Sequence, residues 1–158
     1  FRNKKNYKNE RTADIFVKSS NNLKSINCSP SLNSSAIDEF LIIFLVAAKA
    51  KGISCFKDLS ELNQKESPRL KWGAKILNHI GAKYRLNKDS IKIFGNPKLK
   101  NRKNIIIKGF LKDHRVFMTS VVASLLFGGK WTIHDTSSIK TSFPSFLKKI
   151  RYLGAKIR

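Results

Sequence analysis

Cysteine, acidic residues and long hydrophobic runs are all scarce in this sequence. Its 158 residues include only two cysteines, Cys28 and Cys55, which lie far apart and lack the spacing of a metal site. Structural thiols in a reducing compartment are the plain interpretation, so we expect a cytoplasmic protein without a bound metal. The first residue is Phe1 rather than Met, and we therefore expect a fragment or a processed chain.

No stretch has the length or composition of an export or membrane segment. Residues 1–11 are polar and basic, with neither the apolar run nor the small-residue cleavage site of a secretory signal. The most apolar run, residues 40–48, is far shorter than the roughly 20 residues that span a bilayer. We expect this run to form a buried helix of a soluble protein that has no membrane partner.

Acidic residues are heavily outnumbered by basic ones. The chain has 32 Lys and Arg against 10 Asp and Glu, which gives a formal net charge of +22. Such an excess raises nucleic acid as a partner, because clustered cations neutralise phosphates and release counterions. The basic residues are mostly scattered lysines, however, without an RNP-type aromatic motif or a Cys/His finger. We expect a general attraction for anionic ligands, while a lysine-rich nucleic-acid-binding module stays open as an alternative function.

The order of the expected elements is repeated along the chain. Residues 1–12 show no apolar period and are expected to be a disordered or frayed N-terminal stretch. In a first unit, about 13–95, we predict strands at 13–18, 53–56, 82–85 and 90–94 and helices at 37–51 and 69–79. In a second unit, about 104–158, we predict strands at 104–108 and 131–134 and helices at 115–127 and 144–152.

Both units close on nearly the same four residues. Ile80-Gly81-Ala82-Lys83 closes the first unit and Leu153-Gly154-Ala155-Lys156 closes the second, at an offset of 73 positions. This self-similarity suggests a duplicated unit, with copies that bury apolar faces against each other. We expect residues 13–158 to form one partial domain built from the two units.

Three groups of charged residues fall where the predicted helices begin. They are Asp38, the segment Lys65-Glu66-Ser67-Pro68-Arg69 and the triplet Asp113-His114-Arg115. Proline is tolerated in a first helical turn, and free N–H groups together with the helix dipole favour an anion there. Helix starts of repeated units can converge on one face, which would then carry two carboxylates for proton transfer and two guanidiniums for planar anions.

Taken singly, each group also has a plainer interpretation. Asp38 can be a first-turn acid that the helix dipole favours, and residues 65–69 can be a capping cluster at a solvated helix start. His114 can be a packed or capping histidine, and Arg115 can form a surface ion pair. Convergence of the groups on one face is what would favour a site over these alternatives.

Four short motifs also occur in a specific order. They are Ile37-Asp38-Glu39, Lys65-Glu66-Ser67-Pro68-Arg69-Leu70, Asp113-His114-Arg115 and Thr141-Ser142-Phe143-Pro144-Ser145-Phe146. In this order and spacing the chain, from about Thr12 onward, resembles the C-terminal part of enolpyruvylshikimate-phosphate synthases of the bacterial Thr-Ser-Phe-Pro class. The resemblance implies an α/β (α+β) fold of repeated β-α-β-α-β-β units. Buried parallel helices and outward-facing mixed sheets would form part of an enolpyruvyl transferase-type domain.

The resemblance also implies a reaction and a role for each site residue. The enzyme would move the enolpyruvyl group of phosphoenolpyruvate to the 5-hydroxyl of shikimate 3-phosphate and release phosphate, in the shikimate route to aromatic amino acids. Asp38 would accept the hydroxyl proton, Glu66 would handle the proton at the phosphoenolpyruvate methylene, and Lys65 would contact shikimate 3-phosphate. Arg69 and Arg115 would hold phosphoenolpyruvate. No metal or organic cofactor is implied, since tuned carboxylates and anion-holding cations suffice.

The chain departs from the family's pattern in two ways. Many members have Asp where this chain has Pro68, so we expect Arg69 to lack a first-turn carboxylate that orients it. The family's N-terminal substrate-binding motifs lie outside this sequence. We therefore expect the missing N-terminal part of the enzyme as a partner, no activity of the fragment alone, and a monomer at full length. The sister transferase that acts on a UDP-sugar stays open as an alternative, although the Lys65-Glu66-x-x-Arg69 and Thr-Ser-Phe-Pro motifs argue against it.

Overall fold

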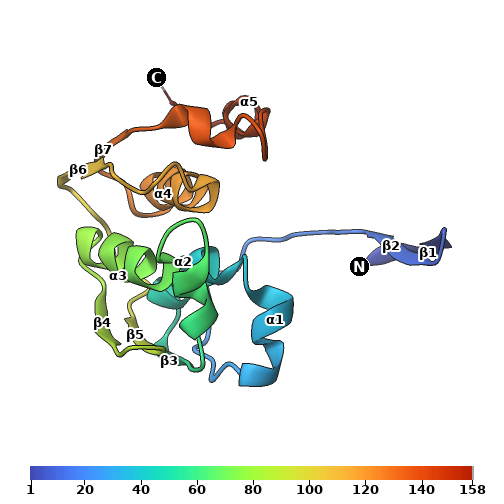
Figure 1. The fold of residues 1–158 in the computed structure, drawn as a ribbon, viewed down its shortest axis with the longest axis horizontal. Helices are drawn as coiled ribbons and strands as arrows, with labels where there is room; N and C mark the ends of the chain where they lie inside the picture. Colours follow the sequence, from blue (N-terminus) through green and yellow to red (C-terminus); the bar gives the residue numbers. More distant parts are fainter. Residues whose placement is uncertain (158) are drawn as a thin grey trace.

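The computed structural model describes residues 1–157, in which helices are stacked between and beside small β-sheets (Figure 1). The strands are β1 (Arg2–Tyr7), β2 (Glu10–Asp14), β3 (Gly52–Phe56), β4 (Lys83–Leu86), β5 (Ile91–Gly95), β6 (Asn104–Ile107) and β7 (Lys130–Ile133). The α-helices are α1 (Asn33–Ala36), α2 (Phe40–Lys49), α3 (Arg69–His79), α4 (His114–Phe127) and α5 (Phe146–Tyr152). Short 3-10 helices are η1 (Pro30–Leu32), η2 (Ser60–Gln64) and η3 (Thr136–Ile139).

The first sheet has the order β3-β5-β4 with antiparallel pairing throughout. On the other side of β3, the segment 24–27 forms parallel bridges to Lys51 and Cys55. Helix α2 packs on β5 and against α3 and α4. Its sequence is apolar on nearly every side, and such a helix is stable only in an interior.

The core is centred on α2 and its aromatic side chains. Phe40 and Phe44 of α2 lie with their ring centroids 6.0 Å and 5.3 Å from that of Phe56 on β3, and all three side chains are buried. Burial of each such side chain contributes roughly 1.5–3 kcal/mol to folding. The aromatic cluster therefore fixes α2 on the sheet and sets the position of the turn that precedes it.

The second sheet pairs β6 with β7 in parallel, with Ile105 opposite Trp131 and Ile107 opposite Ile133. Helix α4 connects these strands and packs against α2 and α3. The arrangement repeats that of the segment 24–27, α2 and β3. The observed architecture agrees with the predicted mixed α/β fold, with helices buried between sheets.

The N-terminal stretch corrects the expectation of a frayed end at 1–12 and a strand at 13–18. Strands β1 and β2 form an antiparallel hairpin in which every residue is exposed, and Figure 1 shows it projecting from the rest of the chain. Lys8 and Asn9 form its two-residue loop, with φ angles of 45° and 65°. Two residues with positive φ are typical of the turn that matches the twist of a hairpin, so this turn directs the strands back together.

Helix α2 begins at Phe40, later than the predicted start at residue 37. The residues before it form a turn, and the side chains of Asp38 and Glu39 reach arginines of other elements. Helix α3 has the predicted bounds, 69–79. The predicted start of α2 was wrong at the residues whose side chains form ion pairs with Arg69 and Arg115.

Within residues 1–157, no single helix has the length and apolar character of a membrane span. By length and composition alone, the helices Pro30–Ala36 and Phe40–Lys49 pass that test as a pair, although they meet at a bend of 119°.

Candidate active site

Arg69, the first residue of α3, lies at the centre of an ion-pair network. Its side chain is 2% exposed. Nε donates to Asp113 Oδ2 at 2.9 Å, and Nη1 donates to Asp38 Oδ1 at 2.7 Å. Nη2 donates to Glu66 and, at 3.4 Å, to Asp113 Oδ1. One guanidinium therefore joins the turn before α2, the loop before α3 and the N-terminus of α4.

Asp113 is the fully buried member of this network. Its side chain is 0% exposed and accepts hydrogen bonds from the backbone N–H groups of Arg115, at 2.9 Å, and Val116, at 3.4 Å. It thereby caps α4, which satisfies donors that have no partner inside the helix. The Ser67 hydroxyl donates to Asp113 Oδ2 at 2.8 Å. A single carboxylate thus connects the start of α4 to the start of α3.

The turn that precedes Asp113 has an unusual backbone conformation. Leu111 and Lys112 both adopt left-handed φ angles, 54° and 56°. Non-glycine residues pay a conformational cost in that region, and such residues cluster at sites where the surrounding structure holds them. A hydrogen bond from the Asp113 N–H to the Phe110 carbonyl at 3.0 Å closes this turn, and the ion pair with Arg69 and the cap of α4 hold Asp113 in place.

Charge and burial shift the pKa values of Asp113 and Arg69 in opposite directions. Burial would raise the pKa of Asp113, but hydrogen bonds from Arg69 and Ser67 and the charge of Arg69 outweigh it, so this pKa lies below its ordinary value. Burial would lower the pKa of Arg69, but the hydrogen bond and charge of Asp113, with the charge of Glu66, raise it. The pair is therefore ionised at neutral pH.

The carboxylates around Arg69 differ in their access to solvent. Asp38 and Glu66 are 46% and 52% exposed, whereas Asp113 is buried. A dissolved substrate can therefore reach Asp38 and Glu66 but not Asp113. Asp113 acts as the internal counter-ion of Arg69, and the two exposed carboxylates are the groups available for proton transfer.

Arg115 forms a second cationic centre that shares Asp38 with Arg69. Its Nη1 donates to Glu39 Oε1 at 2.7 Å and to the Asp38 carbonyl at 3.0 Å, and its Nη2 lies 3.5 Å from Asp38 Oδ2. The side chain of Arg115 is 28% exposed. Two guanidiniums that flank one carboxylate form a site suited to planar anions such as carboxylates and phosphates.

The structure brings together four of the five residues singled out from the sequence. Asp38, Glu66, Arg69 and Arg115 form one continuous set of ion pairs. Lys65 lies next to the set, but its ammonium binds Glu61 at 3.0 Å in the residues preceding α3. The catalytic and binding roles of all five residues stay predictions. Within residues 1–157, no group of three or more His, Cys, Asp or Glu residues could hold a metal ion.

Arg69 lacks a first-turn carboxylate in α3, as expected, but a carboxylate from another element orients it. Pro68 does occupy the position before α3, but Asp113 orients Arg69 from the start of α4. The sequence interpretation missed this role because the two residues are 44 positions apart and meet only through the packing of α3 on α4. The available signal was an Asp two positions before the predicted helix 115–127, since a buried N-cap can also serve as a counter-ion.

Comparison with solved structures identifies the fold as that of the enolpyruvyl transferases. The enolpyruvyl transferase NikO from Streptomyces tendae has a similar fold, with a TM-score of 0.58 and 17% identity over 77% of this chain and 26% of that chain. An EPSP synthase from Acinetobacter baumannii is more similar, with a TM-score of 0.89 and 32% identity over 99% of this chain and 36% of that chain.

The family follows from the sequence comparisons. The model of the EPSP synthase (3-phosphoshikimate 1-carboxyvinyltransferase) family matches residues 5–150, and the chain belongs to this family. The 3-phosphoshikimate 1-carboxyvinyltransferases of Thermodesulfovibrio yellowstonii and Zymomonas mobilis are 35% and 38% identical to it, over 91% and 93% of the chain. The chain spans 33% of the length of each of these relatives.

Proposed function

We propose that this chain supplies one wall of the active site of a 3-phosphoshikimate 1-carboxyvinyltransferase. The enzyme transfers the enolpyruvyl group of phosphoenolpyruvate to the 5-hydroxyl of shikimate 3-phosphate. The observation that carries the proposal is the sharing of Asp38 between Arg69 and Arg115, with Glu66 on the same guanidinium as Asp38. The proposed class is the bacterial one whose last motif is Thr-Ser-Phe-Pro, present here at residues 141–144.

The two accessible carboxylates carry the proton transfers. Asp38 accepts the proton of the 5-hydroxyl as its oxygen bonds to the central carbon of phosphoenolpyruvate. Glu66, released from Arg69 and protonated from solvent, gives its proton to the methylene carbon, so that the central carbon becomes the centre of a tetrahedral intermediate. Loss of phosphate from that intermediate, with return of a proton from the methyl carbon, yields the enolpyruvyl ether. Both carboxylates accept hydrogen bonds from Arg69, Asp38 from Nη1 and Glu66 from Nη2, so the two proton transfers occur beside one guanidinium.

The arginines hold the anionic groups of phosphoenolpyruvate. Without substrate, Arg69 and Arg115 donate to the chain's own carboxylates. An incoming carboxylate or phosphate takes over donors that the exposed side chains of Asp38, Glu39 and Glu66 occupy, whereas buried Asp113 keeps its bond to Arg69. Binding of the anion thereby releases Asp38 and Glu66 for their reactions with protons. Lys65 exchanges Glu61 for the phosphate of shikimate 3-phosphate.

The remaining attributes follow from this function. The partners are the two substrates and the rest of the enzyme, without a specific nucleic-acid partner. The full-length enzyme is a monomer that acts in the cytoplasm and needs no cofactor. This chain alone is inactive, because charged groups act strongly on reacting atoms only where water is excluded and both substrates are held in register.

Kinetics of a joined enzyme test the assigned roles. We define the joined enzyme as this chain linked to the two thirds of the Thermodesulfovibrio yellowstonii relative that it does not cover. Arg115→Ala should mainly raise KM for phosphoenolpyruvate, because it removes an anion clamp. Asp38→Ala should mainly lower kcat, because it removes a proton acceptor.

Exposed residues outside the network provide matched controls. Arg102→Ala and Glu10→Ala remove a guanidinium and a carboxylate at exposed positions and should leave both constants unchanged. Wild-type kinetics of an Asp38→Ala, Arg115→Ala double variant would overturn the proposal.

A further inference from the structure

Arg115 has partners of two kinds, one fixed by the backbone and one on a movable side chain. The Asp38 carbonyl accepts from Nη1 at 3.0 Å, and the Asp38 carboxylate lies 3.5 Å from Nη2. The carbonyl belongs to the turn before α2, so the turn fixes its position. The Glu39 carboxylate accepts from the same Nη1 at 2.7 Å, but it ends a side chain that is 58% exposed. Arg115 can therefore keep its position through Asp38 when the Glu39 carboxylate moves away.

The carboxylate of Glu39 is not needed to hold its own segment. Glu39 is the N-cap residue of α2, but its side chain makes no capping hydrogen bond. Its backbone holds the turn instead, because its N–H donates to the Ala36 carbonyl at 2.9 Å and its carbonyl accepts from the Ile43 N–H at 2.9 Å. Among residues 1–157, the Glu39 carboxylate bonds to Arg115 alone. Its departure would therefore leave the start of α2 intact.

Glu39 also differs in chemical role from the other exposed carboxylates of the network. Asp38 and Glu66 both bond to Arg69, and the proposed reaction uses both for proton transfer. Glu39 bonds to Arg115, and the reaction assigns it no proton. An anion that binds Arg115 needs the Nη1 donor that Glu39 occupies and the positive charge that Glu39 neutralises. The Glu39 carboxylate therefore opposes binding of the anion.

We propose that Glu39 is a built-in competitor for Arg115 and lowers the affinity of the site for phosphoenolpyruvate. Its carboxylate occupies the guanidinium until an anionic group of the substrate replaces it, and the side chain then turns into solvent. The strength of exposed ion pairs corresponds to a change in affinity of about two- to fivefold. The inference rests on the proposed function for the identity of the anion, whereas the exchange of partners involves only Arg115, Asp38 and Glu39.

Steady-state kinetics of the joined enzyme test the competition. Glu39→Gln should lower KM for phosphoenolpyruvate about two- to fivefold, while kcat and KM for shikimate 3-phosphate stay within about twofold. Glu39→Ala, which also removes the acceptor atom, should lower KM for phosphoenolpyruvate at least as far. Glu10→Gln is the matched control at an exposed glutamate of β2 and should leave these constants unchanged. An unchanged KM for phosphoenolpyruvate in both Glu39 variants would overturn the proposal. A raised KM would also overturn it, because Glu39 would then orient Arg115 for the substrate.

A double-mutant cycle separates competition at Arg115 from a general effect of charge. In an Arg115→Gln background the guanidinium is already absent, so adding Glu39→Gln should change KM for phosphoenolpyruvate by less than about twofold. An equal fall in KM with and without Arg115 would show that the negative charge of Glu39 acts on the whole site, and it would contradict the proposal.

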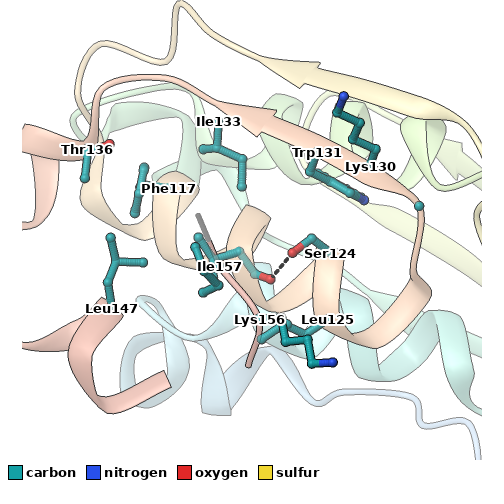
Figure 2. A pocket seen from close by; sticks show the side chains of 12 residues that line it. Phe117, Ser124, Leu125, Lys130, Trp131, Ile133, Thr136, Leu147, Lys156 and Ile157 are labelled. Carbon is teal, nitrogen blue, oxygen red and sulfur yellow. Dashed lines mark hydrogen bonds between the residues drawn. The ribbon is translucent and has the colours of Figure 1, made fainter. Parts of the chain in front are cut away.

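Calorimetric titration of the joined enzyme with inorganic phosphate needs no catalytic activity. Glu39→Gln should lower the Kd for phosphate about two- to fivefold, and Arg115→Gln should raise it. Phosphate can also bind lysines away from this site. Lys130 and Lys156, for example, line a cavity of about 510 Å³ beside α4 and β7 (Figure 2). The effect of Glu39→Gln should therefore persist in a Lys130→Gln, Lys156→Gln background, and its loss there would contradict competition at Arg115.

The kinetic and calorimetric results together distinguish this inference from the proposed function. An inactive joined enzyme whose affinity for phosphate rises in Glu39→Gln would contradict the proposed function and support the competition. An active joined enzyme in which Glu39→Gln changes neither KM for phosphoenolpyruvate nor the Kd for phosphate would support the proposed function and overturn the competition.

Discussion

At the scale of single residues, Asp113 is the buried counter-ion of Arg69, a role that no neighbour of Arg69 in the sequence fills. It neutralises the guanidinium from inside the protein, while the exposed carboxylates of Asp38 and Glu66 stay accessible. This division between an internal counter-ion and exposed partners lets an anion replace the latter without leaving Arg69 unpaired. Asp113 is thus a positioning residue that acts through Arg69.

The first prediction concerns Asp113→Asn. The amide oxygen can still cap α4, but the charge that balances buried Arg69 is lost, so the free energy of unfolding should fall by about 3 kcal/mol. Glu39→Gln breaks the exposed ion pair with Arg115 and should cost less than about 1 kcal/mol. Urea unfolding followed by tryptophan fluorescence measures both changes. Equal small losses in the two variants would contradict the assigned role.

The same variant has a pH signature. The folded-state pKa of Asp113 is lowered, so its contribution to stability is complete above the unfolded value of about 3.9 and is lost as pH falls through the folded value. The wild-type chain should therefore lose stability in acid below about pH 4, and Asp113→Asn should lack that part of the loss.

The second prediction concerns Pro68. A carboxylate at this position would join an arginine that already binds Asp38, Glu66 and Asp113. Pro68→Asp should therefore leave kcat/KM of the joined enzyme unchanged or lower it, since a further negative charge opposes phosphoenolpyruvate. Steady-state kinetics measure the effect, and a clear increase in kcat/KM would show that Arg69 is poorly oriented after all.

The sequence predicted the convergence of Asp38, Glu66, Arg69 and Arg115, because each lies near the start of a helix in a repeated unit. It did not predict Glu39 as a partner of Arg115 or Glu61 as a partner of Lys65. These pairs depend on side-chain directions in turns, and the composition of the turns does not determine those directions.

At the scale of elements, the close crossing of α2 and α3 depends on Gly73. A Cβ atom at this position would lie 2.7 Å from Phe44 Cδ2 and 3.2 Å from Leu41 Cδ2. Phe44 and Leu41 are buried core side chains that have little room to move. Glycine within a helix is therefore explained here by packing rather than by flexibility.

The third prediction follows from this crossing. Gly73→Ala gains about 1 kcal/mol of helix propensity but adds a methyl group to a filled core, which costs about 1–3 kcal/mol, so the midpoint of urea unfolding should fall. Asn78→Ala is the control, because Asn78 is exposed on the same helix and its replacement should be neutral or stabilising. A stabilising Gly73→Ala would contradict the close crossing.

Helices and strands were predictable where apolar residues recur at regular spacing over a long segment, or where a strand is rich in β-branched residues. The bounds of α3 agree with its amphipathic pattern, and β6 follows from the run Ile105-Ile106-Ile107. The hairpin β1–β2 was missed because it buries none of its residues and depends on the turn at Lys8 and Asn9. A regular spacing of apolar residues cannot predict an element that has no buried face.

At the scale of the whole molecule, the net charge of +22 leads to the fourth prediction. Duplex DNA should bind weakly, without preference for sequence, and affinity should fall steeply as salt rises from 50 to 200 mM, because only counterion release drives binding. Fluorescence anisotropy with two duplexes of unrelated sequence measures this. Tight binding to one duplex at physiological salt would instead favour a nucleic-acid-binding module.

The fifth prediction is the most direct test of the central claim, that this chain is one wall of an enolpyruvyl transfer site. Phosphate release from phosphoenolpyruvate and shikimate 3-phosphate is measured for the isolated chain, the joined enzyme and its Asp38→Ala, Arg115→Ala double variant. The account predicts turnover by the joined enzyme, none by the isolated chain and a loss of at least about a hundredfold in kcat/KM for the double variant. Full activity of the isolated chain, or wild-type kinetics of the double variant, would contradict it.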